Sequence, residues 1–485
     1  MAQPSANKKK IVLIYPRTGV KNLVPQTPLS LLTLCPGLEE RGYQPVVIDT
    51  RVESDYRDKI KGLLGDALFV GVTTMTGKQI HYACQISIWI KSFAPETTIV
   101  WGGIHPTMLP EETLNNSFVD IVAAGEGERT IVELADALSG KRVLKGVKGL
   151  YLKDKNGRFT YTGYRELMDI ADLKMPSWHL IDIAKYSEIG IQTGRGCPWR
   201  CRFCYNVKFN ERRWRGKDAS EVIAELKRLK ESYHIDKITF YDDNFFTSKR
   251  RIREICEKMV DERLNLKWST TCRADDLANF DDAFIELMKE SGVHILFVGS
   301  ESGSDTVLTE IIAKDISTRH IRDMARQTAR HKLRVHTSFM VGLPGETAED
   351  REKTYHLMDE IKTIDRDIYI TSTCIYTPYP GNPMYEESIK RGFSPPRNLL
   401  EWSQFNYFHC NLPWLSTKER KVLENLSFIT RFVFWNKEIE ERYLRLYHYP
   451  FYYLFRASAL LRWRHRMFDF SYEWTLFRKF LEELE

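Results

Sequence analysis

The sequence of 485 residues is long enough for two or three domains, each with its own hydrophobic core. Its 43% hydrophobic and 28% charged residues exclude wholesale disorder, and a net charge of +6 is too small to indicate a nucleic-acid-binding protein. The first apolar run is too short for a secretory signal, and no run of about 18 apolar residues predicts a membrane-spanning helix. Six of the nine cysteines are scattered without a pairing pattern, which is typical of a reducing compartment such as the cytoplasm.

Short apolar runs alternate with amphipathic segments over residues 1–140. We expect strands at 11–15, 45–49, 67–72, 98–101 and 121–124, and helices at 28–41, 81–91 and 130–138. This alternation predicts a Rossmann-like, doubly wound parallel sheet, in which ligands bind beyond the carboxyl ends of the strands. No dinucleotide fingerprint follows the first strand, which argues against a nicotinamide cofactor.

Small and hydroxyl-bearing residues gather after the third, fourth and fifth of these strands. The candidates for ligand contact are Thr73, Thr74, Gly102, Gly103, His105, Gly125 and Glu126. Glycines let a flat ligand approach the backbone, and hydroxyl groups can bond its polar edge. Ordinary turn chemistry explains the same residues equally well, so both interpretations stay open on these residues alone.

A second run of strands and helices begins after a connecting segment, residues 141–186, in which Lys155-Asn156-Gly157 predicts a hairpin turn. We expect strands at 188–193, 237–241, 266–272, 294–298, 334–341 and 368–375, and helices at 219–233, 250–263, 280–291, 318–331 and 347–362. Residues 187–390 are therefore predicted to form a partial (β/α)6 barrel of the TIM type, with its chemistry at the carboxyl ends of the strands.

Three cysteines, Cys197, Cys201 and Cys204, follow the first barrel strand with the spacing C-x3-C-x2-C. Thiolates at this spacing on one loop can converge on a single inorganic centre. Four thiolates close an iron–sulfur or zinc site, whereas three leave one metal position open for a substrate. A structural zinc site with a fourth ligand from elsewhere is the alternative.

Charged residues follow the next three barrel strands. Asp242 and Asp243 come after the second strand, where they are candidates for ligand contact, with capping of the next helix as the alternative. Arg273 with Asp275 follows the third strand, and Glu301 follows the fourth. A buried guanidinium or carboxylate is costly unless it is paired. These side chains either bind a zwitterionic ligand or pair among themselves.

Residues 376–385 form a proline- and tyrosine-rich loop after the sixth barrel strand. Proline and glycine constrain its path, and its tyrosines offer apolar faces with polar tips. Tyr376 or Tyr379 is a candidate proton or hydrogen donor, although packing explains either residue as well.

Residues 391–485 are predicted to be a mainly helical region that caps the barrel. Between residues 441 and 480, fourteen of forty residues are aromatic, and eight are Lys or Arg against three acidic residues. A helical cap and an interfacial membrane helix both fit this composition. A nucleic-acid surface would need a cleaner basic stripe.

The cysteine spacing, followed by Tyr205, resembles the signature of the radical S-adenosylmethionine (SAM) enzymes. The resemblance implies that Cys197, Cys201 and Cys204 hold a 4Fe-4S cluster whose fourth iron is chelated by SAM. It also implies that electron transfer from the cluster cleaves SAM to a 5′-deoxyadenosyl radical.

The same resemblance implies SAM-binding roles for four residues. Tyr205 would lie beside the adenine, and Glu301 would accept hydrogen bonds from the ribose hydroxyls. Ser338, on the fifth barrel strand, would reach a polar edge, and Arg273 would pair with the methionyl carboxylate.

The turns GG-x-H-P-T at 102–107 and GEGE at 125–128 resemble those of the cobalamin-binding domain in cobalamin-dependent radical SAM enzymes. The resemblance implies that the candidates after the third to fifth strands contact cobalamin. The D-x-H-x-x-G stretch that supplies a histidine ligand to cobalt in other cobalamin proteins is absent, and Asp49-Thr50-Arg51 stands near its place. His105 is a poor substitute, so we expect a cobalt without a protein histidine.

We therefore expect a cytoplasmic enzyme that methylates an unactivated carbon of a large, hydrophobic small molecule and receives electrons from a flavodoxin- or ferredoxin-type donor. The C-terminal region would allow peripheral contact with the inner face of the membrane, and no nucleic acid is expected as a partner. One alternative is an oxidative cyclase or carbon-bond-forming enzyme acting on a porphyrin-like or lipid substrate. The other is a non-catalytic sensor that binds cobalamin or SAM.

Overall fold

The computed structural model describes residues 9–19, 25–154, 156–407, 410–434, 449–470 and 475. The chain divides into two compact units. Unit 1 consists of Met1–Gly190, Tyr379–Gly381 and Pro395–His409, and unit 2 of Ile191–Pro378, Asn382–Ser394 and Cys410–Glu485. Two segments that lie late in the sequence thus belong to the same unit as the N-terminal sheet.

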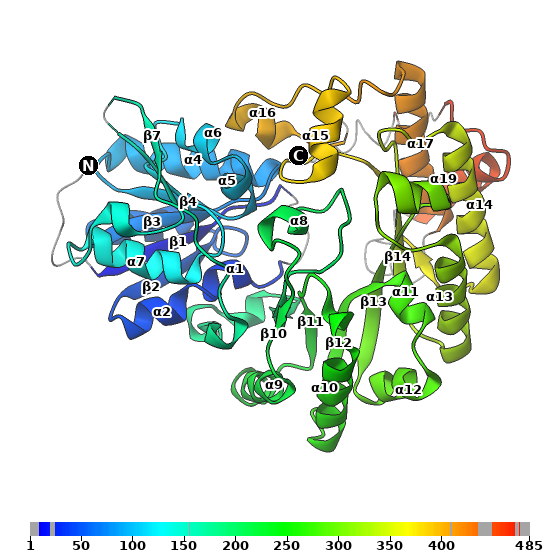
Figure 1. Ribbon diagram of the computed structural model, residues 1–485, viewed down its shortest axis with the longest axis horizontal. Coiled ribbons are helices and arrows are strands. Elements are labelled where there is room, and N and C mark those ends of the chain that lie inside the picture. Colours follow the sequence, from blue (N-terminus) through cyan, green and yellow to red (C-terminus); the bar gives the residue numbers. More distant parts are fainter. Residues whose placement is uncertain are drawn as a thin grey trace. The chain divides into compact units, whose positions relative to one another are not determined.

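Unit 1 contains a seven-stranded sheet in the order β2-β1-β3-β4-β5-β6-β7 (Figure 1). Its strands are β1 (Lys10–Tyr15), β2 (Gln44–Asp49), β3 (Ala67–Thr73), β4 (Ile99–Gly102), β5 (Ile121–Ala123), β6 (Leu150–Lys153) and β7 (Phe159–Tyr161). The first five strands pair in parallel, and β6 and β7 are antiparallel additions. The predicted doubly wound sheet is confirmed. β6 and β7 flank the predicted hairpin turn, in which Gly157 has a positive φ, while Lys155 lies outside the described residues.

The α-helices of unit 1 cover the parallel strands. They are α1 (Leu29–Leu32), α2 (Cys35–Glu40), α3 (Tyr56–Leu63), α4 (Lys78–Phe93), α5 (Ile104–Met108), α6 (Pro110–Leu114), α7 (Glu128–Leu138) and α16 (Leu399–Gln404). Short 3-10 turns are η1 (Leu144–Gly146), η2 (Ile170–Asp172), η3 (Trp178–Leu180) and η4 (Ile183–Lys185). The helix predicted at 28–41 is two helices, because Pro36 at the start of α2 lacks an N–H and would clash with the carbonyl of Leu32 in one continuous helix.

Unit 2 is built on an open parallel sheet in the order β15-β14-β13-β12-β11-β8, with β16 also paired to β14. The strands are β8 (Ile189–Ile191), β11 (Lys237–Phe240), β12 (Lys267–Arg273), β13 (Val293–Glu301), β14 (Val335–Val341), β15 (Tyr369–Ile370) and β16 (Cys374–Ile375). This is the predicted partial barrel. The sixth strand is divided into β15 and β16, because the Thr373 N–H donates to the Thr430 hydroxyl (3.0 Å) instead of to β14.

Six α-helices follow the barrel strands of unit 2. They are α9 (Ala219–Tyr233), α10 (Lys249–Asp261), α11 (Ala274–Ala278), α12 (Asp282–Glu290), α13 (Thr318–His331) and α14 (Ala348–Ile364). The observed bounds of α9 and α13 are those predicted. Capping boxes at Asp218 and Ser317 explain their sharp starts, and left-handed C-cap residues, His234 and Lys332, explain their ends. A 3-10 turn, η5 (Phe245–Thr247), and a π-helical turn, η6 (Val307–Ile311), lie in the loops.

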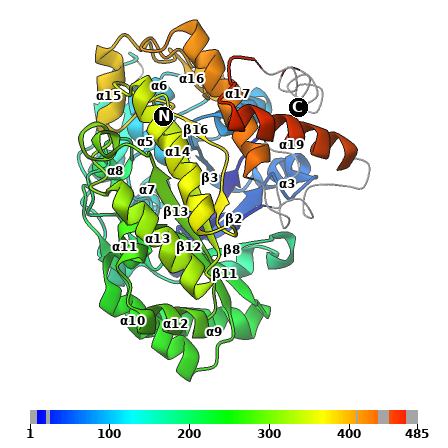
Figure 2. The same cartoon turned by 90° about the vertical axis from the view of Figure 1, so that its right-hand side faces the viewer.

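The C-terminal region is mainly helical in its described part, as predicted. Its α-helices in unit 2 are α15 (Pro383–Lys390), α17 (Thr417–Val433) and α19 (Tyr449–Arg464). α17 packs on β16 and on α19 (Figure 2), and the Trp463 indole N–H on α19 donates to Asp359 on α14 (2.6 Å). α17 therefore covers the edge of the sheet at β16, which would otherwise be exposed. In the part of the chain that the structure describes, no helix is both long and apolar enough to cross a membrane.

Candidate functional site

The loop of residues 194–205, called the cysteine loop below, follows β8 in unit 2. It begins as β9 (Gly194–Arg195), which pairs antiparallel with β10 (Arg215–Gly216), and it ends at α8 (Asn206–Phe209). Gly196 has a φ of +81°, and a Cβ there would lie 1.9 Å from the Arg213 carbonyl oxygen. Only glycine fits this close approach, which sets the path of the chain into Cys197.

The thiols of Cys197, Cys201 and Cys204 lie within electrostatic reach of one another. Burial raises the pKa of all three, that of Cys204 to about 12, and a charge on Cys201 would raise the pKa values of the other two further. In the described part of the chain, no three His, Cys, Asp or Glu side chains lie close enough together to bind a single metal ion. A cluster of several irons is larger than one ion and keeps its thiolates further apart, so three soft ligands on one loop fit such a cluster.

Asn244 adds a hydrogen-bond donor beside Cys197. Its buried side-chain nitrogen has no well-formed hydrogen bond within the described residues. Burial raises the pKa of Cys197, and the contact with Asn244 lowers it. A buried donor without an acceptor is costly, and a thiolate or a cluster sulfur at this position would satisfy it.

Asp243 holds the cysteine loop at both of its ends. Its carboxylate accepts hydrogen bonds from the Gly196 N–H (2.7 Å), the Tyr205 hydroxyl (3.1 Å) and the Asn206 side chain (2.7 Å). Tyr205 also packs edge-on against Phe209, with the ring centroids 5.9 Å apart. One carboxylate after β11 thus joins the start and the end of the loop.

Its neighbour Asp242 anchors the strand that leads into the loop. It accepts from both the N–H (2.7 Å) and the hydroxyl (2.6 Å) of Thr193, and burial raises its pKa to about 6. Neither aspartate caps α10: its N-cap residue is Ser248, whose side chain makes no capping hydrogen bond. The alternative of helix capping is therefore wrong, because these carboxylates turn toward the neighbouring strand end instead of along the chain.

Arg273 lies against the middle of the cysteine loop. Its guanidinium lies over the Trp199 ring, 3.9 Å from the centroid, and donates to Asp275 (2.9 Å) and to the Lys314 carbonyl oxygen (2.7 Å). Of the pairings left open by the sequence, Arg273 with Asp275 is the one that occurs. Burial raises the pKa of Cys201, and the positive charges of Lys314 and Arg273 oppose that shift.

Glu301 forms an ion pair with Lys314, which the sequence analysis did not single out. The Lys314 ammonium lies 2.6 Å from Glu301 Oε1 and 2.8 Å from the Gly299 carbonyl oxygen. Glu301 has a φ of +63° at a bulge between β13 and β14, and a Cβ on Gly299 would lie 2.2 Å from its carboxylate. Ser338 lies opposite Gly299 on β14. Strained backbone of this kind is typical of functional sites.

Tyr376 is enclosed. Its side chain is buried, its hydroxyl lies 3.5 Å from the Ser388 hydroxyl on α15, and its ring centroid is 6.3 Å from that of Trp414. These contacts are those of a packing residue.

In unit 1, the residues predicted to contact cobalamin lie at the carboxyl ends of β3, β4 and β5. Thr73 on β3 pairs with Gly102 on β4, and the Gly125 N–H donates to the Thr107 hydroxyl (3.0 Å). Gly103 has a φ of +100°, and a Cβ there would lie 2.7 Å from the Thr74 carbonyl oxygen. Gly125, at φ +84°, is exposed with open space above it. We call Thr73, Gly102, Gly103 and Gly125 the glycine edge.

Three further candidates lie beneath or beside this edge. Thr74 and His105 are fully buried, and the Glu126 carboxylate accepts from the Met168 N–H (2.7 Å). Trp402 on α16 packs on the imidazole of His105 at 5.6 Å between ring centroids. Burial lowers the pKa of His105 to about 3, so the ring is neutral. No signal in the sequence indicated that Trp402 covers this histidine.

Asp49, near the place of the missing cobalt-binding histidine, is fully engaged. Arg51 binds it through two nitrogens (2.9 and 2.6 Å), and the Tyr186 hydroxyl donates to it (3.2 Å). The Arg51 guanidinium also lies over the Tyr15 ring, 4.0 Å from its centroid. The place of the missing histidine is thus taken by the Asp49–Arg51 ion pair, whose guanidinium packs on the Tyr15 ring.

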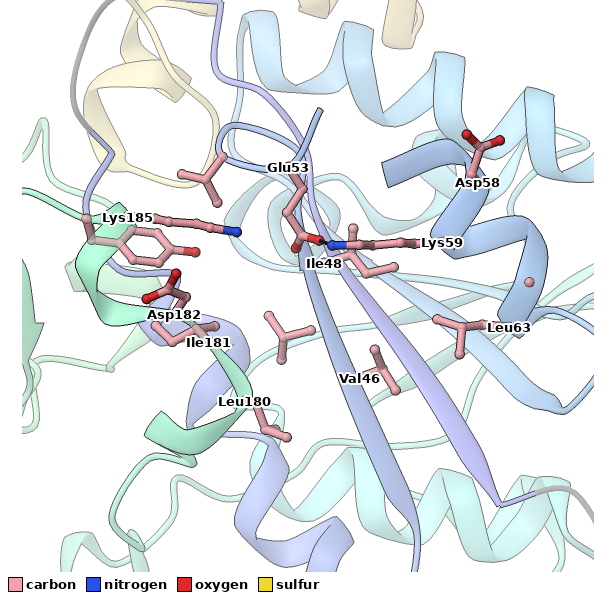
Figure 3. Close-up of a pocket in the computed structure, with 14 residues that line it drawn as sticks. Val46, Ile48, Glu53, Asp58, Lys59, Leu63, Leu180, Ile181, Asp182 and Lys185 are labelled. Carbon is pink, nitrogen blue, oxygen red and sulfur yellow. Dashed lines mark hydrogen bonds and ion pairs between the residues drawn. The ribbon is translucent and has the colours of Figure 1, made fainter. Parts of the chain in front are cut away.

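A cavity of about 580 Å³ lies beside β2, the edge strand of unit 1 (Figure 3). β2, α3 and residues 180–186 line it, and the Lys59–Glu53 ion pair (2.5 Å) lies on its wall. None of the predicted site residues lines this cavity, so it is separate from the glycine edge.

Comparison with known proteins finds two family models. Residues 191–358 match the radical SAM superfamily, and residues 23–135 match the B12 binding domain. An uncharacterised methyltransferase of Pyrococcus horikoshii is 33% identical over 395 residues, covering 78% of this chain and 83% of the relative. The anaerobic magnesium-protoporphyrin IX monomethyl ester cyclase of Rubrivivax gelatinosus is 24% identical over 397 residues, 78% of this chain and 70% of the relative.

Among solved structures, the radical SAM methyltransferase TsrM from Kitasatospora setae, with cobalamin and a [4Fe-4S] cluster bound, is similar in fold. The TM-score is 0.70 at 17% identity, covering 95% of this chain and 99% of that one. The N-terminal match contains β2 to β5 and the glycine edge, and the second match begins just before the cysteine loop.

Proposed function

Because the chain belongs to the cobalamin-dependent enzymes of the radical SAM superfamily, we propose that it methylates an unactivated carbon of a large, hydrophobic small molecule. Its cofactors are a 4Fe-4S cluster, SAM and cobalamin. When bound, the cluster and SAM supply the radical chemistry, and cobalamin supplies the methyl group. The observation that carries the proposal is the cysteine loop: Asp243 joins its two ends, and two cations, Lys314 and Arg273, lie near Cys201.

Cys197, Cys201 and Cys204 would hold the cluster. Asn244 would donate to a sulfur at Cys197, which satisfies its buried nitrogen. Asp243 acts as a positioning residue, since it contacts the loop on both sides of the cysteines and none of its bonds is to a thiol. A loop pre-organised in this way keeps its ligands in place when the cluster is absent.

The SAM contacts that we propose surround the same loop. Lys314 binds Oε1 of Glu301, and we assign Oε2 to the ribose hydroxyls. Arg273 and Lys314 place two positive charges beside Cys201, where they favour the methionyl carboxylate. Ser338 lies opposite Gly299, and Tyr205 would lie beside the adenine.

For cobalamin we assign direct contact to the glycine edge. Its exposed and half-buried backbone accepts a flat ligand, whereas buried Thr74 and His105, together with Glu126, support that backbone from below. His105 is covered by Trp402, and Asp49 is paired with Arg51, so neither position offers an imidazole to cobalt. Electron paramagnetic resonance of the cob(II)alamin form should show no superhyperfine splitting from a protein imidazole; such splitting would contradict this assignment.

A hydrophobic substrate is supported by the face of the barrel sheet that is not buried beneath α-helices. Along β14, Val335, Thr337, Phe339 and Val341 point to the buried face, and the residues between them are half-buried. On β13, Phe297 is 38% exposed, and its ring packs edge-on against that of His336 at 5.4 Å. This surface suits an apolar ring or chain. The electron donor is proposed to be of the flavodoxin or ferredoxin type, in the reducing cytoplasm.

An oxidative cyclase is the second candidate, and the 24% identity with the Rubrivivax cyclase favours it. The chain is an enzyme by its family, so the hypothesis of a non-catalytic sensor is not retained. Both candidates share every cofactor and differ in the fate of the methyl group of SAM.

The fate of SAM separates the two candidates. Anaerobically reconstituted protein is incubated with methyl-deuterated SAM, cobalamin and a chemical reductant, and S-adenosylhomocysteine and 5′-deoxyadenosine are quantified. A methyltransferase forms both, and deuterium enters the product once a substrate is supplied. Formation of 5′-deoxyadenosine without S-adenosylhomocysteine would support the cyclase and contradict methyl transfer. Formation of neither would contradict both.

A further inference from the structure

Helix α19 packs on unit 2 through one of its faces. Tyr452, Ala459 and Trp463 are buried on this face, in contact with α17 and α14. The Tyr452 ring lies 6.1 Å from that of Phe432, and the Trp463 ring 5.0 Å from that of Phe434. The helix is therefore held firmly enough to present its other face in a defined direction.

The other face is apolar and exposed. On the helix, the exposed fractions are 55% for Tyr453, 66% for Leu454, 45% for Leu460 and 60% for Leu461. Met467 and Phe470, in the segment after the helix, are also exposed. Residues 453, 457, 460 and 464 recur at intervals of three or four, and so do residues 454, 457, 461 and 464, so together they form one stripe along the helix. Other large exposed apolar side chains, such as Ile88 and Val143, are scattered over the rest of the described chain. We call the exposed apolar residues between 453 and 461 on this face the leucine stripe.

Positive charge borders the leucine stripe. Residues 449–470 contain four arginines and one acidic residue, Asp469. Arg466 is engaged with Glu352 and Asp359 on α14, whereas Arg464 and His465 are exposed at the carboxyl end of the helix. An exposed apolar stripe that ends in cationic side chains is the pattern of a helix that lies in a membrane interface.

We infer that the leucine stripe binds the surface of an anionic phospholipid bilayer. The leucines would enter the boundary between headgroups and acyl chains, and Arg464 would remain among the phosphates. A second copy of the chain is a poorer occupant, because a two-fold contact between identical stripes would bring two sets of arginines together. This inference does not depend on the methyl-transfer reaction.

The test is vesicle flotation of the full chain with phosphatidylglycerol vesicles and with phosphatidylcholine vesicles. Wild-type protein should float with the anionic vesicles, and high salt should weaken that binding. The double variant Leu454→Glu with Leu461→Glu should lose about tenfold in partition coefficient for each leucine removed. Val143→Glu alters an exposed apolar residue of unit 1 (74% exposed) and should float like wild type.

Iron content and 5′-deoxyadenosine formation should be unchanged in the double variant, which shows that it folds. If the wild-type protein floats with neither kind of vesicle, the inference is overturned. Equal flotation of wild type and the double variant would also overturn it. Light scattering tests whether a second copy of the chain binds the leucine stripe instead. A wild-type dimer that the double variant converts to a monomer, without lipid, would assign the leucine stripe to self-association instead.

Discussion

The cysteine loop of unit 2 and the glycine edge of unit 1 are built by different means. In the cysteine loop, charged side chains hold the geometry: Asp243 bridges the two ends, and Arg273 covers Trp199. In the glycine edge, the backbone conformation holds the geometry, with Gly103 and Gly125 at positive φ. Beneath that edge, Thr74 and His105 are buried, and the His105 ring is neutral.

The difference follows from what each region must hold. A cluster with thiolate ligands brings negative charge into a partly buried place, which only nearby donors and cations can offset. A large planar cofactor needs surface without side chains, and glycine provides it. The two regions should therefore fail in different ways when they are altered.

The largest effect should come from Cys197→Ala, which removes a cluster ligand. We expect loss of the cluster and no measurable 5′-deoxyadenosine, because the remaining two thiols cannot hold it. Cobalt bound per chain should stay near the wild-type value, since unit 1 is unchanged. Cys256→Ala, at a buried cysteine on α10, is the control and should retain both cofactors. Retention of 5′-deoxyadenosine formation by Cys197→Ala would contradict the assignment.

Next comes Asp243→Ala, which leaves every cysteine in place. It removes the carboxylate that accepts hydrogen bonds from both ends of the cysteine loop, so 5′-deoxyadenosine formation should fall about tenfold to a hundredfold. Iron content after reconstitution should fall less than in Cys197→Ala. Asp236→Asn alters an exposed residue just before β11, the strand that Asp243 follows, and this variant should behave as wild type. If full activity survived in Asp243→Ala, a positioning role would be excluded.

Gly103→Ala should damage the other region. The added Cβ meets the Thr74 carbonyl oxygen at 2.7 Å on a backbone with a φ of +100°, which should destabilise unit 1 by about 3 kcal/mol. Gly163→Ala has a similar φ, +104°, and open space, and should cost only about 1 kcal/mol. Thermal unfolding and bound cobalt measure both. Equal losses in the two variants would show that close packing at Gly103 is unimportant.

Glu346 should make unit 2 less stable as the pH rises from acid toward neutral. Burial raises its pKa to about 7 from 4.5, and its carboxylate accepts from the Gly342 N–H (2.6 Å). Above pH 4.5 the unfolded chain loses this proton more readily than the folded chain, so stability is lost as pH rises to 7. The loss should be about 2 to 3 kcal/mol between pH 5 and pH 7.5. Urea unfolding should show this loss in wild type and not in Glu346→Gln; equal slopes would disprove it.

His105 should make unit 1 sensitive to acid, the opposite direction. Its folded-state pKa is about 3, against 6.5 in the unfolded chain, so stability is lost as pH falls below 6.5. About 2 kcal/mol should disappear between pH 7.5 and pH 5. In His105→Asn the same comparison of urea midpoints should lack this component. An unchanged pH profile in that variant would mean that the imidazole is accessible to solvent in the folded protein.

Residues that follow a strong local pattern could be predicted from the sequence. The three cysteines were found from their spacing alone, and α9 and α13 were bounded correctly because their caps are adjacent in the chain. Lys314 could not be found, because it lies in a loop after a π-helical turn and meets Glu301 only through the bulge in β13. The Asp242–Asp243 pair was noticed, but its partners on the neighbouring loop were not apparent from local sequence.

The sequence by itself determined the order of strands and helices, the cysteine loop and the glycine turns, since these depend on residues a few positions apart. Tertiary structure decided which charges meet. Trp402 covers a histidine almost three hundred residues earlier, and α17 closes the sheet edge through Thr430. Such contacts arise because buried polar groups must find partners wherever the fold brings them, and separation along the chain does not limit that choice.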